Sequence, residues 1–320
     1  MWFNFVMRNH GATAGGEYLS PLTDYMRATM GACGHETTLV QDEIYPSAIN
    51  VFFEYFTDPA FVEQVLELRR AHGLKIGVIA TELMIGGTIP YAKHGMPWSG
   101  DKQTYLEQRV AGFERFASGV DFVWSWLERT AQQYRDCASA SRFFPVGHVA
   151  GCSPATHSSP KDIDVMFFGT RTPHRTAVLE SFRAHGIKVV CVGRGFPVGY
   201  LSKSYLASLM DRAKIGLNLN LHAEDDTVDG IDPRFASCMR IVEMLERQLC
   251  IVSEVIPLDN PYRDFMRSES PERLALACKE LLSDGAWQRA GEIASAKFRT
   301  QMSVVDICKP VIDVTLASIF

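Results

Sequence analysis

The stretch DVMFFGTRTPHRTAVL, residues 164–179, decides the fold of the second half of the chain. Its segment 165–168 is continuously apolar, as a strand covered on both faces must be. After Gly169, Thr172 is placed to cap a helix that opens with Pro173, whose missing N–H costs nothing at that position. The stretch therefore predicts a buried parallel strand, a glycine turn and the start of a helix.

The same turn carries basic side chains. Arg171, His174 and Arg175 lie around the start of the predicted helix. Free backbone N–H groups and the positive end of the helix dipole favour an anion there, and a phosphate group is the natural occupant. The alternative is a strand, turn and helix whose basic residues only face solvent, and this stretch alone leaves both interpretations open.

Length, charge and cysteine spacing narrow the class of protein to which the chain can belong. A chain of 320 residues suits two domains of about 150 residues each. Its formal net charge of -5 argues against a nucleic-acid backbone as the main partner. The eight cysteines show no metal-ligand spacing and indicate reduced thiols in a cytoplasmic protein. The sequence shows neither a signal peptide nor the ~20 apolar residues of a membrane span.

Strand and helix patterns alternate along both halves of the chain. We expect strands at 2–8, 37–41, 47–56, 75–82, 120–126, 164–169, 188–193, 214–222 and 249–254, with helices including 17–34, 58–73, 175–186, 203–213 and 237–248. This predicts an α/β fold of two doubly wound, Rossmann-like parallel sheets that face a central cleft. Ligands of such sheets bind at the carboxyl ends of the strands.

A break in the pattern places the domain boundary. Residues 151–162 are rich in Gly, Pro and Ser and mark a linker. We therefore expect domains at 1–150 and 163–320. The second domain ends in a helical tail from about residue 271, kinked or divided by Pro310, that can pack back on the first domain.

Four segments carry a family resemblance. DVMFFGTRTPHR, AKIGLNLNLH, RIVEMLE and CIVSE, within residues 162–256, resemble the donor-binding half of GT-B glycosyltransferases, particularly those similar to the bacterial and phage spore-maturation type (CgeB-like). The first half resembles the family less, through its glycine-rich turn GATAGGEYL. The resemblance implies transfer of a sugar, typically a hexose, from a UDP-, GDP- or dTDP-sugar to a hydroxyl of a glycan, protein, lipid or small molecule. It implies no cofactor and no metal ion.

The resemblance also implies a donor site. The diphosphate would lie at Gly169 to Arg175, and the nucleoside near Arg240, Glu243, Ser253 and Glu254. The expected donor-binding residues are Gly15, Gly16, Gly169, Thr170, Arg171, Arg175, Arg194, Asn220, His222, Arg240, Glu243, Ser253 and Glu254.

One position departs from the family pattern. Many retaining GT-B families carry two glutamates eight positions apart, and if Glu243 is the second, Phe235 occupies the place of the first. Inverting and retaining chemistry therefore both stay open. Arg240 lies three residues before Glu243 on one helix face, so the two could instead form a surface ion pair.

Two other motifs fail on inspection. The glycines of VGRGFPVG, residues 192–199, have the wrong spacing for a dinucleotide fingerprint, and Pro197 interrupts the turn. The acidic loop at 222–232 has Ala236 where a calcium loop needs a bidentate glutamate. Neither a nicotinamide or flavin enzyme nor a calcium site is predicted.

An inverting transfer needs a base that takes the proton of the acceptor hydroxyl. His10 ends the first strand, where some GT-B enzymes have a histidine base, and Glu82 and Glu54 end later strands. We expect His10 or Glu82 to act as the base, with Glu54 as a further competitor. Two other functions stay open: a sugar-nucleotide epimerase or hydrolase, and a binding protein without catalysis.

Overall fold

A computed structural model describes most of the chain. It leaves out residues 8–14, 85–86, 88, 90–101, 136–139, 152–158, 222–233, 235–237 and 258–259, and the side chains of residues 15–20 and 102–103. The chain forms two compact units. Unit 1 comprises Met1–Lys93, Trp98–Val149 and Val304–Phe320, and unit 2 is mainly Ala150–Ser303.

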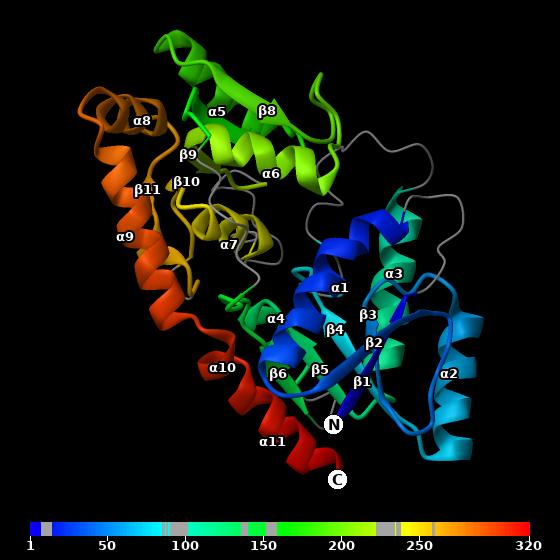
Figure 1. The fold of residues 1–320 in the computed structure, drawn as a ribbon. Coiled ribbons are helices and arrows are strands. Elements are labelled where there is room, and N and C mark those ends of the chain that lie inside the picture. Colours follow the sequence, from blue (N-terminus) through cyan, green and yellow to red (C-terminus); the bar gives the residue numbers. More distant parts are fainter. Residues whose placement is uncertain are drawn as a thin grey trace. The chain divides into compact units, whose positions relative to one another are not determined.

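Unit 1 is built on a parallel sheet in the order β2-β1-β3-β4-β5-β6 (Figure 1). Its strands are β1 Trp2–Met7, β2 Glu36–Gln41, β3 Ile49–Phe53, β4 Lys75–Ala80, β5 Phe122–Ser125 and β6 Ser141–Phe143. Its helices are α1 Gly15–Ala32, α2 Pro59–His72, α3 Lys102–Ala117, α4 Glu128–Gln133, α10 Val304–Ile307 and α11 Lys309–Ile319.

Helices cover both faces of the unit 1 sheet. Phe113 and Phe116 of α3 and Val65 of α2 pack with Phe52 of β3 in one buried cluster. On the other side Trp124 of β5 donates a hydrogen bond from Nε1 to Thr315 Oγ1 of α11 at 3.0 Å. The C-terminal helix thus supplies a partner for a buried indole of unit 1.

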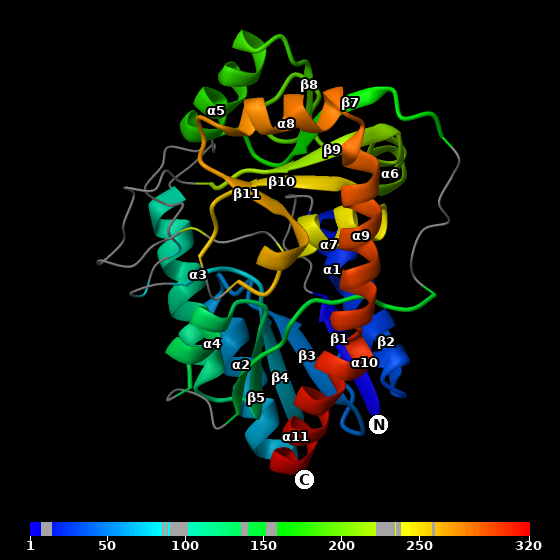
Figure 2. The ribbon, with the colours of Figure 1, turned by 90° about the vertical axis from the view of Figure 1, so that its left-hand side faces the viewer.

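Unit 2 has a second parallel sheet, in the order β11-β10-β9-β7-β8. Its strands are β7 Ile163–Phe168, β8 Val189–Val192, β9 Ala213–Asn218, β10 Cys250–Glu254 and β11 Arg267–Glu269. Its helices are α5 Pro173–Ala184, α6 Lys203–Arg212, α7 Cys238–Glu246, α8 Leu274–Ser283 and α9 Ala286–Gln301. Figures 1 and 2 both show α5 and α8 side by side, and these two helices share one buried cluster with the sheet.

The opposite face of the unit 2 sheet receives α7. Ile241, Met244 and Leu245 of this helix are buried, as its apolar face predicts. A Cβ atom at Gly216 of β9 would lie 2.3 Å from Met244 Sδ. Glycine at this strand position therefore allows α7 to approach the sheet closely.

The structure confirms the α/β fold with two doubly wound parallel sheets. The predicted helix at 58–73 is α2, capped by Asp58, whose carboxylate accepts from the backbone N–H of Ala60, and ended by Gly73 with a φ of 63°. Pro310 lies in the first turn of α11, which explains the predicted division of the tail. The short edge strands β6 and β11 are not among the predicted strands.

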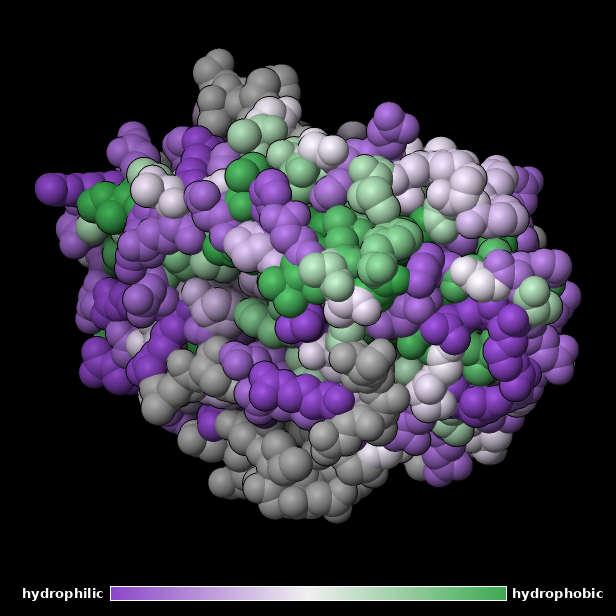
Figure 3. Space-filling model, turned by 90° about the horizontal axis from the view of Figure 1, so that it is seen from below, coloured by the Kyte–Doolittle hydropathy of each residue, from purple (hydrophilic) through white to green (hydrophobic). Residues whose placement is uncertain are grey.

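Apolar side chains gather at the centre of the face shown in Figure 3. The exposed apolar residues of unit 1 include Met1, Val314 and Phe320.

In the described part of the chain, no helix has the length and apolar character needed to cross a membrane.

Candidate functional site

Two glycine turns meet at the carboxyl ends of β7 and β8. Gly169 follows β7 with a φ of 150°, and Gly193 follows β8 with a φ of 125°. A Cβ atom at Gly193 would lie 2.3 Å from the carbonyl oxygen of Gly169, so only glycine fits there. Beyond the turn, Thr172 Oγ1 accepts a hydrogen bond from Arg175 N at 3.2 Å, which confirms the predicted cap of α5.

Arg175 of α5 is buried, with 4% of its surface exposed. Its guanidinium donates to the backbone carbonyls of Thr170, Leu219 and Asn220 at 2.7, 2.8 and 3.0 Å. The side chain therefore fastens the end of β9 to the glycine turn. Burial, reinforced by the nearby charge of Arg240, holds the pKa of Arg175 well below its usual range. Its predicted contact with a diphosphate stays a prediction.

Arg240 of α7 brings a second guanidinium to the same turn. Its Nη2 lies 2.7 Å from the position of a Cβ atom at Gly169, and its guanidinium lies 5.4 Å from the centre of the Phe167 ring. Burial lowers the pKa of Arg240 to about 10, so the group stays charged near neutral pH. Two cations therefore flank Gly169, at the amino end of α5.

Glu254 is the buried carboxylate of this region, with 2% of its surface exposed. Its Oε1 lies 2.7 Å from Nε2 of His174, and its Oε2 accepts from the backbone N of Asn220 at 2.6 Å. Ser253 Oγ accepts from Asn218 Nδ2 at 2.9 Å. The carboxylate of Glu254 thus ties α5 to the ends of β9 and β10. Ser253 and Glu254, which are both expected near the nucleoside, have partners inside unit 2.

Two polar groups in this region lack partners. Asn220 Oδ1 is buried without a hydrogen bond among the described residues. Glu243 is half-buried and makes no ion pair with Arg240, whose Nη1 contacts Asn218 Oδ1 at 3.3 Å instead. Burial raises the pKa of Glu243, against the opposing charges of Lys203, Arg247 and Arg240. Its carboxylate is available to a ligand.

Arg171 is exposed on the loop between Gly169 and α5. Its Nε donates to Thr176 Oγ1 at 3.1 Å, and its backbone N donates to the carbonyl of Arg194 at 2.8 Å. The turns after β7 and β8 therefore bring Arg171 and Arg194 together, and Arg171 keeps its terminal nitrogens toward solvent.

Three predicted donor residues are not part of the described unit 2 site. His222 falls outside the described residues. Gly15 and Gly16 begin α1 and so belong to unit 1. His174 is one of the basic residues predicted around the anion, although it is not in the list of expected donor-binding residues, and it contacts Glu254 directly. The sequence signal for His174 is its position two residues after Thr172, the cap of the predicted helix.

Unit 1 has its own polar cluster at strand ends. Glu54 follows β3 and is fully buried, and its carboxylate accepts from Thr81 N at 2.8 Å and Arg109 Nη2 at 3.0 Å. Glu82 follows β4, and its Oε1 lies 3.4 Å from the same Arg109 nitrogen, with 13% of the side chain exposed. Burial raises the pKa of Glu54 despite the charge of Arg109. His10 lies outside the described residues.

These contacts separate the carboxylates of unit 1. Glu54 has no exposed surface and holds Arg109 and Thr81, so Glu82 is the more accessible of the two acids. Among the described residues, no group of three or more His, Cys, Asp or Glu side chains could hold a metal ion.

Known proteins share this architecture. No protein-family model matches the chain, and no curated protein matches its sequence. An α-glucosyltransferase solved in complex with UDP and a 13-mer DNA containing a HMU base has a TM-score of 0.67 at 12% identity, over 99% of each chain. T4 phage β-glucosyltransferase has a TM-score of 0.59 at 12% identity, over 100% of this chain and 99% of that one.

A third solved structure extends the comparison. AviGT4, a glycosyltransferase involved in avilamycin A biosynthesis, has a TM-score of 0.56 at 11% identity, over 99% of this chain and 98% of that one. The chain has the GT-B fold. In that GT-B fold, the cations around Gly169 lie at the carboxyl ends of the unit 2 strands, where doubly wound sheets bind their ligands.

Proposed function

We propose that the chain transfers a sugar from a nucleotide-sugar donor to an acceptor hydroxyl, without a metal ion. The observation that supports this most is the pair of guanidinium groups, Arg175 and Arg240, around Gly169 at the start of α5. Positive charge at a helix N-terminus suits a diphosphate, whose negative charge grows as the sugar leaves.

The donor roles divide among four side chains. Arg171 has exposed terminal nitrogens and would contact the phosphates directly. Arg175 and Arg240 would supply positive potential from the wall of the site, since Arg175 already bonds three carbonyls. Glu243, which has no ion pair among the described residues, would accept the hydroxyl protons of the ribose.

The base would come from unit 1. Glu82 is a carboxylate at a strand end, it is partly exposed, and Arg109 Nη2 holds it at 3.4 Å. His10 is the competing base, and a variant of each separates the two assignments. A loss of turnover of roughly 10²–10⁴-fold is expected for the true base.

The solved relatives suggest where to begin. The α-glucosyltransferase was solved with UDP, and another structure of the T4 phage enzyme was solved with UDP-glucose, which makes a UDP-sugar the first donor to test. The relative solved with DNA containing a HMU base adds such DNA to the acceptor panel, beside glycans, lipids and small molecules. The finer assignment to the spore-maturation type is part of this proposal. So is a cytoplasmic location, which the six free thiols among the described residues suggest.

The test is release of nucleotide diphosphate from a panel of UDP-, GDP- and dTDP-sugars, with and without acceptors, with and without EDTA. Release that requires an acceptor and persists in EDTA is expected. Release without an acceptor would indicate a hydrolase, a changed donor without release would indicate an epimerase, and binding without turnover would indicate a binding protein. Loss of activity in EDTA would contradict metal-independent transfer.

A further inference from the structure

A pocket of about 590 Å³ opens beside β6, the edge strand of the unit 1 sheet. Its lining comes from three places: the end of α4, strand β6 and helix α11. A volume of this size lies within the range of roughly 300–1,000 Å³ that small-molecule sites occupy. None of the lining residues belongs to the polar clusters at the strand ends. The pocket is therefore separate from the proposed transfer chemistry.

Among the residues that the structure describes, two arginines of this pocket have no anionic partner. Arg142 of β6 is half-buried, its Nε is buried without a hydrogen bond, and it forms no ion pair with any residue that the structure describes. Arg135, just after α4, is exposed and also unpaired within that part of the chain. Arg69 shows the contrast, since it donates two hydrogen bonds to Asp121 at 2.8 and 3.1 Å.

An unpaired guanidinium that is partly buried is unfavourable unless an anion approaches it. The arginine fork matches the oxygens of a phosphate or a carboxylate, which it can bind through two parallel hydrogen bonds. Arg142 is therefore suited to an oxyanion as its ligand. Ser141 supplies no negative charge, because its side chain is a hydroxyl, which donates to the carbonyl of Ala131 at 2.9 Å.

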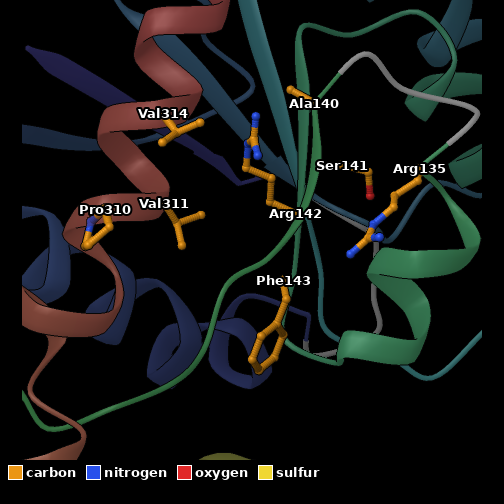
Figure 4. Close-up of a pocket in the computed structure, with 8 residues that line it drawn as sticks. All are labelled: Arg135, Ala140, Ser141, Arg142, Phe143, Pro310, Val311 and Val314. Carbon is orange, nitrogen blue, oxygen red and sulfur yellow. The ribbon is translucent and has the colours of Figure 1, made fainter.

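The rest of the pocket is apolar. Figure 4 shows Arg142 on the side of β6 that faces α11, opposite Val311 and Val314, with Arg135 and Ser141 on the other side of the strand. Pro310 continues the α11 wall. The site thus offers two cations for a charged head and an aliphatic wall for an uncharged body.

We propose that this pocket binds a small organic anion, in which a phosphate or carboxylate head is attached to an apolar group. Arg142 and Arg135 bind the head, and Val311 and Val314 contact the apolar group. A bare inorganic anion gains only the first of these contacts and so binds more weakly.

The test is calorimetric titration of the full chain with phenyl phosphate, benzoate and inorganic phosphate. Phenyl phosphate or benzoate is expected to bind at least tenfold more tightly than inorganic phosphate, and the tighter of the two identifies the head group. Arg142→Gln and Arg135→Gln are each expected to weaken that binding at least tenfold. Arg115→Gln is the matched control, because it removes the same charge from an exposed ion pair with Glu63 on unit 1, outside the pocket.

Two results would overturn the proposal: no measurable binding of either aromatic anion, or equal weakening by all three variants. Arg135 is exposed, so its variant keeps the test valid even if Arg142→Gln disturbs the packing of α11. Thermal unfolding of each variant checks that the fold is retained.

Discussion

At the scale of single residues, the unit 2 site contains arginines with different duties. Arg171 has terminal nitrogens in solvent, whereas those of Arg175 bond backbone carbonyls. The sequence places both arginines beside the same helix start and cannot separate them. Two of the three carbonyls that accept from Arg175 belong to residues 219 and 220, more than forty positions downstream. Only the fold brings them together.

This difference predicts the effect of Arg171→Ala. Charge-assisted hydrogen bonds contribute about 1.5–3 kcal/mol each, so the variant should lose about that much affinity for UDP and little for uridine. Calorimetric titration of both ligands measures the two losses. Arg183→Ala, an exposed change in the last turn of the same helix, is the control and should leave both affinities unchanged. Equal losses for UDP and uridine would assign Arg171 to the fold rather than to the phosphates.

Glu243 carries a second prediction. A carboxylate without an ion pair, half-buried on α7, is suited to accept the two hydroxyl protons of a ribose. Glu243→Gln should therefore cost about 1.5–3 kcal/mol of affinity for UDP and less for its 2′-deoxy analogue, which offers only the 3′-hydroxyl. Titration of wild type and variant with both nucleotides gives the comparison. A variant that keeps the full preference for the ribonucleotide would show that Glu243 does not contact the sugar.

Glu54 predicts a pH dependence of stability. Burial raises its pKa above the usual 4.5, so the folded chain binds this proton more tightly than the unfolded chain does. The stabilisation that results is fully present below pH 4.5 and is lost as the pH rises through the raised pKa. A tenfold change in the ionisation constant corresponds to about 1.4 kcal/mol.

The measurement is urea unfolding of wild type and Glu54→Gln between pH 4 and pH 8. We expect wild type to lose stability relative to the variant as the pH rises through this range, since glutamine cannot ionise. A difference in unfolding free energy that is flat with pH would mean that the pKa of Glu54 is the same in both states.

At the scale of elements, the sequence is most informative where a helix has a cap and a strand is fully buried. The segment 164–179 gives β7, the turn and α5 because Thr172 and Pro173 mark the helix start. β6 and β11 are not predicted because a strand of three residues is too short to show an alternation of apolar and polar side chains. The contact of Glu54 with Arg109, 55 residues away, likewise follows from the pairing of β3 with β4 and from α3, not from any local pattern.

The cap of α5 is testable by itself. Thr172 Oγ1 accepts from Arg175 N and donates to the carbonyl of Leu221 at 3.3 Å. Thr172→Ala should lower the free energy of unfolding of unit 2 by about 0.5–2 kcal/mol, the usual cost of a lost N-cap. Thr172→Ser keeps the hydroxyl and should lie near wild type in chemical unfolding. Equal destabilisation by both variants would attribute the effect to the lost methyl group and not to the cap.

At the scale of the whole molecule, the chain does not divide into two consecutive halves. Residues Val304–Phe320 follow unit 2 in sequence but belong to unit 1. Within unit 1, Ile312 and Cys308 of this segment are fully buried, and Thr315 accepts the hydrogen bond of Trp124. The sequence signals the helices of the tail, but not which core they complete, since an amphipathic helix specifies a buried face without specifying its neighbour.

Because residues Val304–Phe320 belong to unit 1, deleting them should destabilise unit 1. A chain that ends at Ser303 loses α10 and α11, which exposes apolar surface and leaves the buried Nε1 of Trp124 without its acceptor. Unit 1 should therefore lose stability, although the deleted segment adjoins unit 2 in sequence. Hydrogen exchange read by mass spectrometry should show reduced protection in peptides from β1 and β5, with peptides from β7 and β9 little changed.

Thr315→Val tests the same contact without truncation, and the loss of one buried hydrogen bond should cost about 1–3 kcal/mol because an indole N–H stays unsatisfied. Protection lost equally from β7 and β9 in either variant would show that the tail stabilises unit 2 as much as unit 1.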